Sequence, residues 1–117
     1  MQLNGSNVDE NIADNIGLQV SYRALRDYLS SSNDTMRLPG LEQYTADQIF
    51  FLSMANNYCD SNSNVKLTKY VDGTIKHQPG KYRIIGSVSN SPAFSRSFKC
   101  KKSDKMNPEK KCIIWGK

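Results

Sequence analysis

The sequence of 117 residues contains a single histidine, His77, and this scarcity excludes several kinds of metal site. A zinc site that takes two histidines from one chain, such as H-E-x-x-H on a helix, is not encoded here. The sequence also has only three cysteines, which cannot all pair with one another and follow no C-x-x-C spacing. On its own, the sequence therefore lacks the residues for a conventional metal or disulfide framework.

Long apolar runs are missing too. The longest, residues 49–52, falls far short of the roughly 20 residues that a membrane-spanning helix needs. Residues 1–5 contain neither the basic nor the apolar region of a secretion signal. We therefore expect no membrane segment in this chain, and we expect any secretion signal or anchor to lie outside it. Asn4 and Asn33 each begin an N-x-S/T tripeptide, which allows glycosylation in a secretory setting.

Positive charges outnumber negative charges only slightly. Sixteen lysines and arginines against eleven aspartates and glutamates give a net charge of +5, which does not mark a nucleic-acid binder. Few aromatic residues lie among the basic residues near the end of the chain, which argues against a stacking platform for single strands. We therefore expect no nucleic-acid partner. The basic residues near the end of the chain are expected to form a solvated face, and they are Lys99, Lys101, Lys102, Lys105, Lys110, Lys111 and Lys117.

The length corresponds to one domain, and residues 1–117 are treated as a single segment. Apolar residues recur every four positions over residues 9–29, which predicts a helix. Gly17 in its middle suggests the close approach of another backbone. Thr45 and Gln48 form a capping box, and the helix that it opens, to about Tyr58, is apolar over most of its circumference and is expected to be buried.

Several shorter signals complete the fold prediction. Ser91 and Pro92 are typical of a helix start, and this helix is expected to reach Phe98. Asn107-Pro108 repeats that signal before residues 109–111. Residues 82–85 form a short strand candidate, and a second strand is expected near Ile113. The predicted fold class is mainly α with short β segments, that is, α+β.

The most distinctive acidic pair is Glu10 and Asp14. Residues four apart on a helix lie on one face, one turn from each other. Both can be solvated acids that complement the positive end of the helix dipole. Alternatively, one can be a zinc ligand while the other orients a ligating histidine. The spacing alone leaves both interpretations open.

A family resemblance favours the second interpretation. Residues 10–18, E-N-I-A-D-N-x-G-L, resemble a block of the neprilysin and endothelin-converting-enzyme family of zinc metalloendopeptidases. The resemblance continues in order through L-P-G-L at 38–41, H-x-P-G-x-x-R at 77–83, G-S-V-x-N-S-P-x-F at 86–94 and M-N-P-x-x-K-C-x-x-W at 106–115. It covers nearly the whole chain and matches only the C-terminal portion of that family's catalytic region.

The resemblance implies a role for each candidate site residue. Glu10 corresponds to the third zinc ligand, and Asp14 to the aspartate that orients a zinc histidine. His77 corresponds to the histidine that stabilises the tetrahedral intermediate, and Arg83 to the arginine that holds the substrate backbone carbonyl. Without the resemblance, His77 would be interpreted as an exposed loop histidine and Arg83 as a surface strand residue.

The same resemblance implies what lies outside the chain. One zinc ion would take its other ligands from an upstream part of the same catalytic domain, which also supplies the general base. Disulfide partners outside the chain are implied for Cys59, Cys100 and Cys112, although three reduced thiols in a cytosolic protein remain an alternative. The implied fold is the C-terminal helical portion of a thermolysin-like (gluzincin) catalytic domain, incomplete on its own.

The leading functional hypothesis is therefore the C-terminal part of an extracellular or cell-surface zinc metalloendopeptidase that hydrolyses oligopeptides and is inactive as the isolated segment. Asp9, Ile16 and Ile75 depart from the family pattern, and Tyr58 stands where tryptophan is common. These departures support an alternative, a non-catalytic secreted or cell-surface binding module built on the same scaffold. A third hypothesis is that two chains reassemble through the apolar helix and disulfides.

Overall fold

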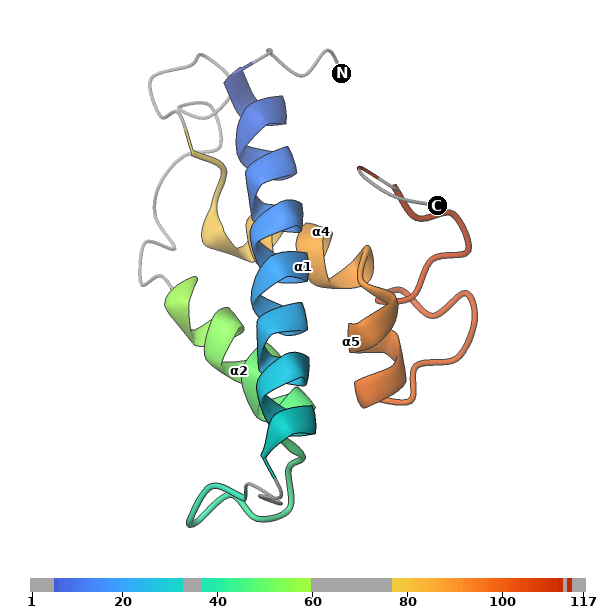
Figure 1. The fold of residues 1–117 in the computed structure, drawn as a ribbon. Coiled ribbons are helices and arrows are strands. Elements are labelled where there is room, and N and C mark those ends of the chain that lie inside the picture. Colours follow the sequence, from blue (N-terminus) through green and yellow to red (C-terminus); the bar gives the residue numbers. More distant parts are fainter. Residues whose placement is uncertain (1–5, 33–36, 60–76, 113, 115–117) are drawn as a thin grey trace.

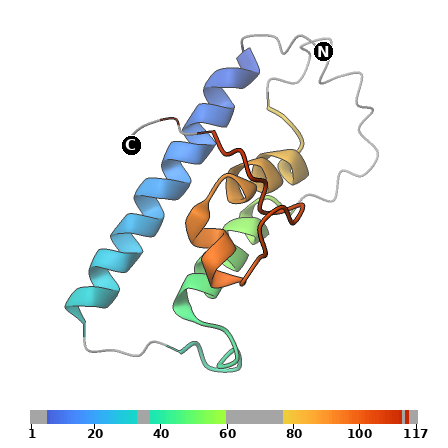
Figure 2. The ribbon, with the colours of Figure 1, turned by 90° about the vertical axis from the view of Figure 1, so that its right-hand side faces the viewer.

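A computed structural model of the chain describes residues 6–32, 37–59, 77–112 and 114. Within these residues the regular structure is entirely helical and comprises α1 (Ser6–Ser31), α2 (Ala46–Asn57), α4 (Gly80–Ser89) and α5 (Pro92–Ser97). α1 forms a long straight rod (Figure 1). The three shorter helices pack on the same side of that rod (Figure 2). The mainly helical character that we predicted is thus confirmed for the described part of the chain.

α1 extends a few residues beyond both predicted ends, which were 9 and 29. Its 26 residues are numerous enough to span a bilayer, but none of the helices in the described ranges is sufficiently apolar to do so. α1 instead turns one side toward α4, its main partner among the helices. α1 also carries exposed large apolar residues such as Val20 and Tyr28.

Residues 82–85, which we expected to form a short strand, lie inside α4, so that prediction is wrong. Helical spacing decides the conformation here, because Ile84 and Val88, four residues apart, both pack on the core. Four residues are too few to separate a period of 3.6 from a period of 2. The second expected strand, near Ile113, lies outside the described residues.

The helix start predicted at Asn107-Pro108 is also wrong, because residues 107–111 have no regular helix. The side chain of Asn107 has a different task. It accepts a hydrogen bond from Ser95 Oγ at 2.8 Å and donates one to the Lys101 carbonyl at 3.0 Å. Asn107 therefore ties the loop that follows α5 back to that helix.

The other two predicted helix starts, at Thr45 and at Ser91-Pro92, are confirmed. Gln48 N donates to Thr45 Oγ1 at 3.2 Å, and Thr45 N donates to Gln48 Oε1 at 2.9 Å, so the capping box is complete. Ser91 caps α5 with its side chain, and Pro92 occupies the first turn. Gln48 has a further role, since its amide donates to the Ser97 carbonyl at 3.0 Å and so joins the start of α2 to the end of α5.

The core is small and is centred on one buried aromatic residue. Phe51 of α2 lies at its centre with only 2% of its surface exposed. Its ring centroid lies 5.4 Å from those of both Tyr22 and Phe94. The other buried apolar residues in the described part of the chain are Leu18, Val88 and Ala93. Leu52, the neighbour of Phe51, is 41% exposed, so α2 is buried along one side, and the prediction of a buried helix is met on that side alone.

Gly17 does not serve the purpose that we predicted for it. Among the described residues, a Cβ atom at this position would have no neighbour within 4 Å, so no close contact requires a glycine there. Gly17 instead lines an apolar groove of about 650 Å³ between α1 and α2, together with Leu25, Leu38 and Met54. The glycine that does permit a close backbone contact is Gly80, next to the candidate site.

Candidate active site

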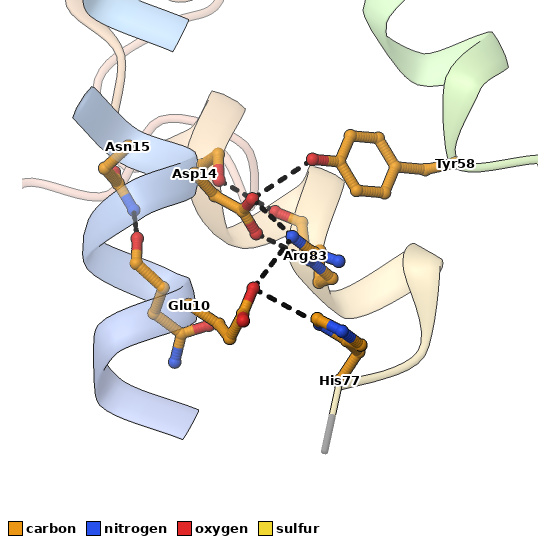
Figure 3. A network of polar contacts seen from close by, with 8 residues as sticks. Glu10, Asp14, Asn15, Tyr58, His77 and Arg83 are labelled. Carbon is orange, nitrogen blue, oxygen red and sulfur yellow. Dashed lines mark hydrogen bonds and ion pairs between the residues drawn. The ribbon is translucent and has the colours of Figure 1, made fainter. Parts of the chain in front are cut away.

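α1 and α4 bring all four sequence-predicted site residues together. Glu10 and Asp14 lie one turn apart on α1 and point toward α4 (Figure 3). Arg83 lies in the first turn of α4. His77 belongs to the segment that leads into that helix, and its ring faces Glu10 (Figure 3).

Asp14 and Arg83 form the tightest contact of the site. Arg83 Nε donates to Asp14 Oδ2 at 2.7 Å, and Arg83 Nη2 donates to Asp14 Oδ1 at 2.7 Å. Such paired, charge-assisted bonds fix both the distance and the orientation of a guanidinium group. The hydrogen bond to Asp14 is the main cause that raises the pKa of Arg83 above its ordinary value. Only 7% of the Asp14 side chain is exposed, so Asp14 is not a solvated surface acid.

Glu10 is in a more open environment than Asp14. Its side chain is 34% exposed, and its Oε2 atom lies 3.2 Å from His77 Nδ1 and 3.4 Å from Arg83 Nη2. Both contacts are longer than those of Asp14, and the His77 side chain is 60% exposed. The two carboxylates therefore differ in kind. Asp14 is buried and committed to Arg83, whereas Glu10 remains accessible.

Tyr58, at the C-terminal end of α2, is a member of the site that we did not identify from the sequence. Its hydroxyl donates to Asp14 Oδ1 at 3.1 Å, and its ring lies 5.2 Å below the guanidinium carbon of Arg83. Burial raises the pKa of the Tyr58 hydroxyl, and the charge of Asp14 raises this pKa further. The phenol is thereby kept in the form that can donate a hydrogen bond.

Gly80 explains how the end of α2 approaches the start of α4 so closely. A Cβ atom at residue 80 would lie 2.5 Å from the Tyr58 carbonyl oxygen and 3.3 Å from its carbonyl carbon. Both atoms belong to the backbone, so a side chain at residue 80 would force the two helix ends apart. The glycine of the H-x-P-G motif thus sets the distance between Tyr58 and Arg83.

We expect Gly80→Ala to lower the free energy of unfolding by about 1–3 kcal/mol, because an added methyl group has to displace backbone in a tightly packed contact. Urea titration of the chain measures this change. Gly86→Ala is the matched control, since Gly86 lies in the same helix and a Cβ there meets nothing within 4 Å. This control is expected to stabilise the chain by about 0.5–1 kcal/mol through helix propensity. Equal effects of both substitutions would contradict the proposed close contact.

Near the site, the side chain of Asn90 joins three parts of the chain through hydrogen bonds. Its amide nitrogen donates to Asn15 Oδ1 at 2.9 Å and to the Cys112 carbonyl at 2.7 Å. Its amide oxygen accepts from Cys112 N at 2.6 Å. Asn90 therefore joins α1, the end of α4 and the C-terminal segment. Its only sequence signal was its place in the G-S-V-x-N block.

The described residues do not form a complete zinc site. They contain no group of three histidine, cysteine, aspartate or glutamate side chains placed to hold a metal ion. Glu10 is the more exposed of the two carboxylates of the cluster, so it fits a single ligand of a site that further residues would complete. Cys59 and Cys112 are exposed free thiols, and Cys100 is a half-buried one, so the implied disulfides stay a prediction.

Comparison with known proteins agrees with the geometry. The sequence model of the family described as Peptidase family M13 matches residues 1–114. Human neprilysin is 44% identical over 117 residues, which cover 97% of this chain and 15% of that protein. Neprilysin-11 of Caenorhabditis elegans is 41% identical over 106 residues, covering 91% of this chain and 12% of the relative.

Human endothelin-converting enzyme-like 1 is 39% identical over 115 residues and again covers 97% of this chain and 15% of its own length. The chain thus spans a small part, between 12% and 15%, of these three curated relatives. Since the family's sequence model extends over nearly the whole chain, including every residue of the site, this chain belongs to peptidase family M13.

Proposed function

We propose that the chain supplies one carboxylate ligand and the substrate-binding side chains of a zinc-dependent metalloendopeptidase that hydrolyses peptide bonds in oligopeptides. The observation that carries this proposal is the cluster of Glu10, Asp14, His77 and Arg83. These residues lie up to 73 positions apart in the sequence and yet fall within hydrogen-bonding range of one another. The rest of the catalytic unit, including H-E-x-x-H, would come from further polypeptide, in line with the greater length of the relatives.

When bound, zinc would activate a water molecule for attack on the scissile carbonyl. Within this chain, Glu10 is suited to bind the metal because its carboxylate is partly exposed. Asp14 would orient a metal-binding histidine from the rest of the catalytic unit, although its two oxygens are already engaged by Arg83. A carboxylate can accept more than one hydrogen bond at each oxygen, so both tasks are compatible.

His77 and Arg83 would act on the substrate. The His77 Nδ1 atom faces Glu10, and in the doubly protonated ring Nε2 would donate to the developing oxyanion. Among the described residues, the hydrogen bonds of the Arg83 guanidinium all leave from Nε and Nη2. Nη1 would then donate to a substrate backbone carbonyl from a group that is already fixed in orientation, which lowers the entropy lost on binding.

The setting that we propose is extracellular, either secreted or as a plasma-membrane ectodomain. In support, Cys59 and Cys112 are exposed, where partners on other polypeptide can reach them. The glycosylation tripeptides at Asn4 and Asn33 agree with this setting. Thiol counting under non-reducing conditions, on protein from a secretory host, tests whether the cysteines are paired.

The decisive experiment is a chimera in which this chain replaces the matching segment of human neprilysin. We expect the secreted chimera to hydrolyse a fluorogenic peptide and to retain zinc. We expect Glu10→Ala in this chimera to lower kcat/KM at least about 100-fold, equal to about 2.7 kcal/mol of transition-state stabilisation, with a matching loss of zinc. Glu42→Ala is the control, because Glu42 lies in an exposed turn, where its side chain accepts a hydrogen bond from Gly40 N.

A folded, secreted chimera that binds zinc but cleaves no peptide would overturn the catalytic proposal and favour the non-catalytic binding module. A chimera in which Glu10→Ala leaves zinc content unchanged would overturn the assignment of Glu10 as a ligand. Circular dichroism and secretion yield establish beforehand that each variant is folded.

A further inference from the structure

Tyr58 lies at the end of a third helix, α2, and contacts both members of the Asp14–Arg83 pair. α2 ends at Asn57, and Tyr58 is its C-cap residue. The Tyr58 backbone N–H still bonds back to the Ala55 carbonyl at 3.1 Å, which fixes the residue to the last turn of the helix. Its side chain is therefore delivered to the site from a rigid support.

Asp14 Oδ1 receives two donors at once. Tyr58 Oη donates to it at 3.1 Å and Arg83 Nη2 donates to it at 2.7 Å (Figure 3). The hydroxyl thus restrains rotation of the carboxylate about its Cβ–Cγ bond. Because that carboxylate holds Arg83 through two parallel bonds, any rotation of Asp14 would also tilt the guanidinium group.

The ring of Tyr58 acts on Arg83 directly. The guanidinium carbon lies 5.2 Å from the ring centroid, which is within the range of a favourable cation–π contact. The Arg83 side chain is 20% exposed, so its remaining surface is covered by protein. The Asp14–Arg83 ion pair joins α1 and α4, and Tyr58 contacts this pair from the end of α2.

We propose that Tyr58 is a positioning residue that keeps Arg83 aligned for substrate binding, through a hydrogen bond to Asp14 and stacking below the guanidinium group. The inference deepens the proposed function and rests on it for the role of Arg83 toward substrate. One part of the proposal concerns only the orientation and mobility of Arg83, and this part can be measured in the chain without any catalysis.

Three variants separate the contributions of Tyr58. Tyr58→Phe removes the hydroxyl and keeps the ring, whereas Tyr58→Leu removes both. Asn57→Ala is the matched control, since Asn57 is the preceding residue, lies on the same helix end and is exposed. Tyr58→Phe removes one polar atom and is the variant on which the interpretation depends if Tyr58→Leu fails to fold.

The first measurement uses the 117-residue chain and records the Arg83 Nε–H signal by nuclear magnetic resonance. In the wild type this proton is bound to Asp14 Oδ2 and should exchange slowly with water. We expect Tyr58→Phe to speed its exchange about 3-fold and Tyr58→Leu about 10-fold or more, as coupled neighbours show interaction energies of this order. An exchange rate in Tyr58→Phe equal to that of the wild type and of Asn57→Ala would overturn the proposal.

The second measurement follows peptide hydrolysis by the neprilysin chimera. Since Arg83 would bind the substrate backbone before and during reaction, we expect Tyr58→Phe to raise KM about 5-fold with little change in kcat. In an Arg83→Ala background the same substitution should have no further effect. An equal loss in both backgrounds would show that Tyr58 acts on stability alone and would overturn the proposal.

The two measurements distinguish the two levels of inference. An inactive chimera contradicts the proposed function, and the exchange rate of Arg83 Nε–H still decides whether Tyr58 holds the guanidinium group. An active chimera whose KM is unaffected by Tyr58→Phe contradicts the positioning role alone.

Discussion

Asp14→Ala is expected to lower the free energy of unfolding by about 3–5 kcal/mol, because it leaves the mostly buried Arg83 guanidinium without its carboxylate. The Asp14 side chain is 7% exposed and the Arg83 side chain 20%, so water would replace the lost hydrogen bonds only in part. Tyr58 would lose its acceptor in the same variant. Urea titration monitored by circular dichroism measures the change.

A surface pair provides the control for this effect. Arg26 and Asp47 also contact each other across two helices, at 3.4 Å, but the Arg26 side chain is 53% exposed. Arg26→Ala is expected to cost at most about 1 kcal/mol, as is usual for solvated pairs. If both substitutions cost the same, Asp14 does not hold a desolvated charge and the central contact of the site is wrong.

Phe51→Ala is expected to destabilise the chain by about 3–5 kcal/mol through loss of buried aromatic area and creation of a cavity. Phe51 is 2% exposed, and its ring touches the rings of residues on α1, α2 and α5. It is the point at which these three helices meet. The small size of the core gives the surrounding residues little opportunity to close the cavity.

Leu52→Ala is the matched control for Phe51→Ala. The two residues are adjacent on α2, but Leu52 is 41% exposed and its truncation removes little buried area. We expect a loss below about 1 kcal/mol, since surface substitutions usually have small effects. Comparable losses for the two variants would mean that the helix packs in a different rotation from the one described.

Two of the three helix starts expected from capping signals are confirmed, and the third, at Asn107-Pro108, is not. The capping box at Thr45 and the Ser91-Pro92 start are both present, because the interactions that they describe lie within a single helical turn. The strand predicted at residues 82–85 failed for the opposite reason. Its apolar residues make helical contacts with a core assembled from distant segments, and a window of four residues contains no information about that core.

The candidate site shows the same division between local and distant information. The pairing of Glu10 and Asp14 on one helix face follows from their spacing. Their proximity to His77 and Arg83 could be inferred only through the family resemblance, because nothing local connects these segments. Tyr58 and Gly80 act through a contact between two helix ends. Such a contact has no periodic signature, so neither role could be predicted from the sequence.

The Asp14–Arg83 contact also has a consequence for the order in which the chain folds. The two residues are 69 positions apart, and the neighbouring Asn15–Asn90 hydrogen bond spans 75 positions. Contacts this distant form only after a long loop has closed, and the entropy of that closure is lost before any bond compensates for it. Each helix can begin to form from its own turns, whereas the site has no local nucleus. We therefore expect the site to assemble only once that loop has closed.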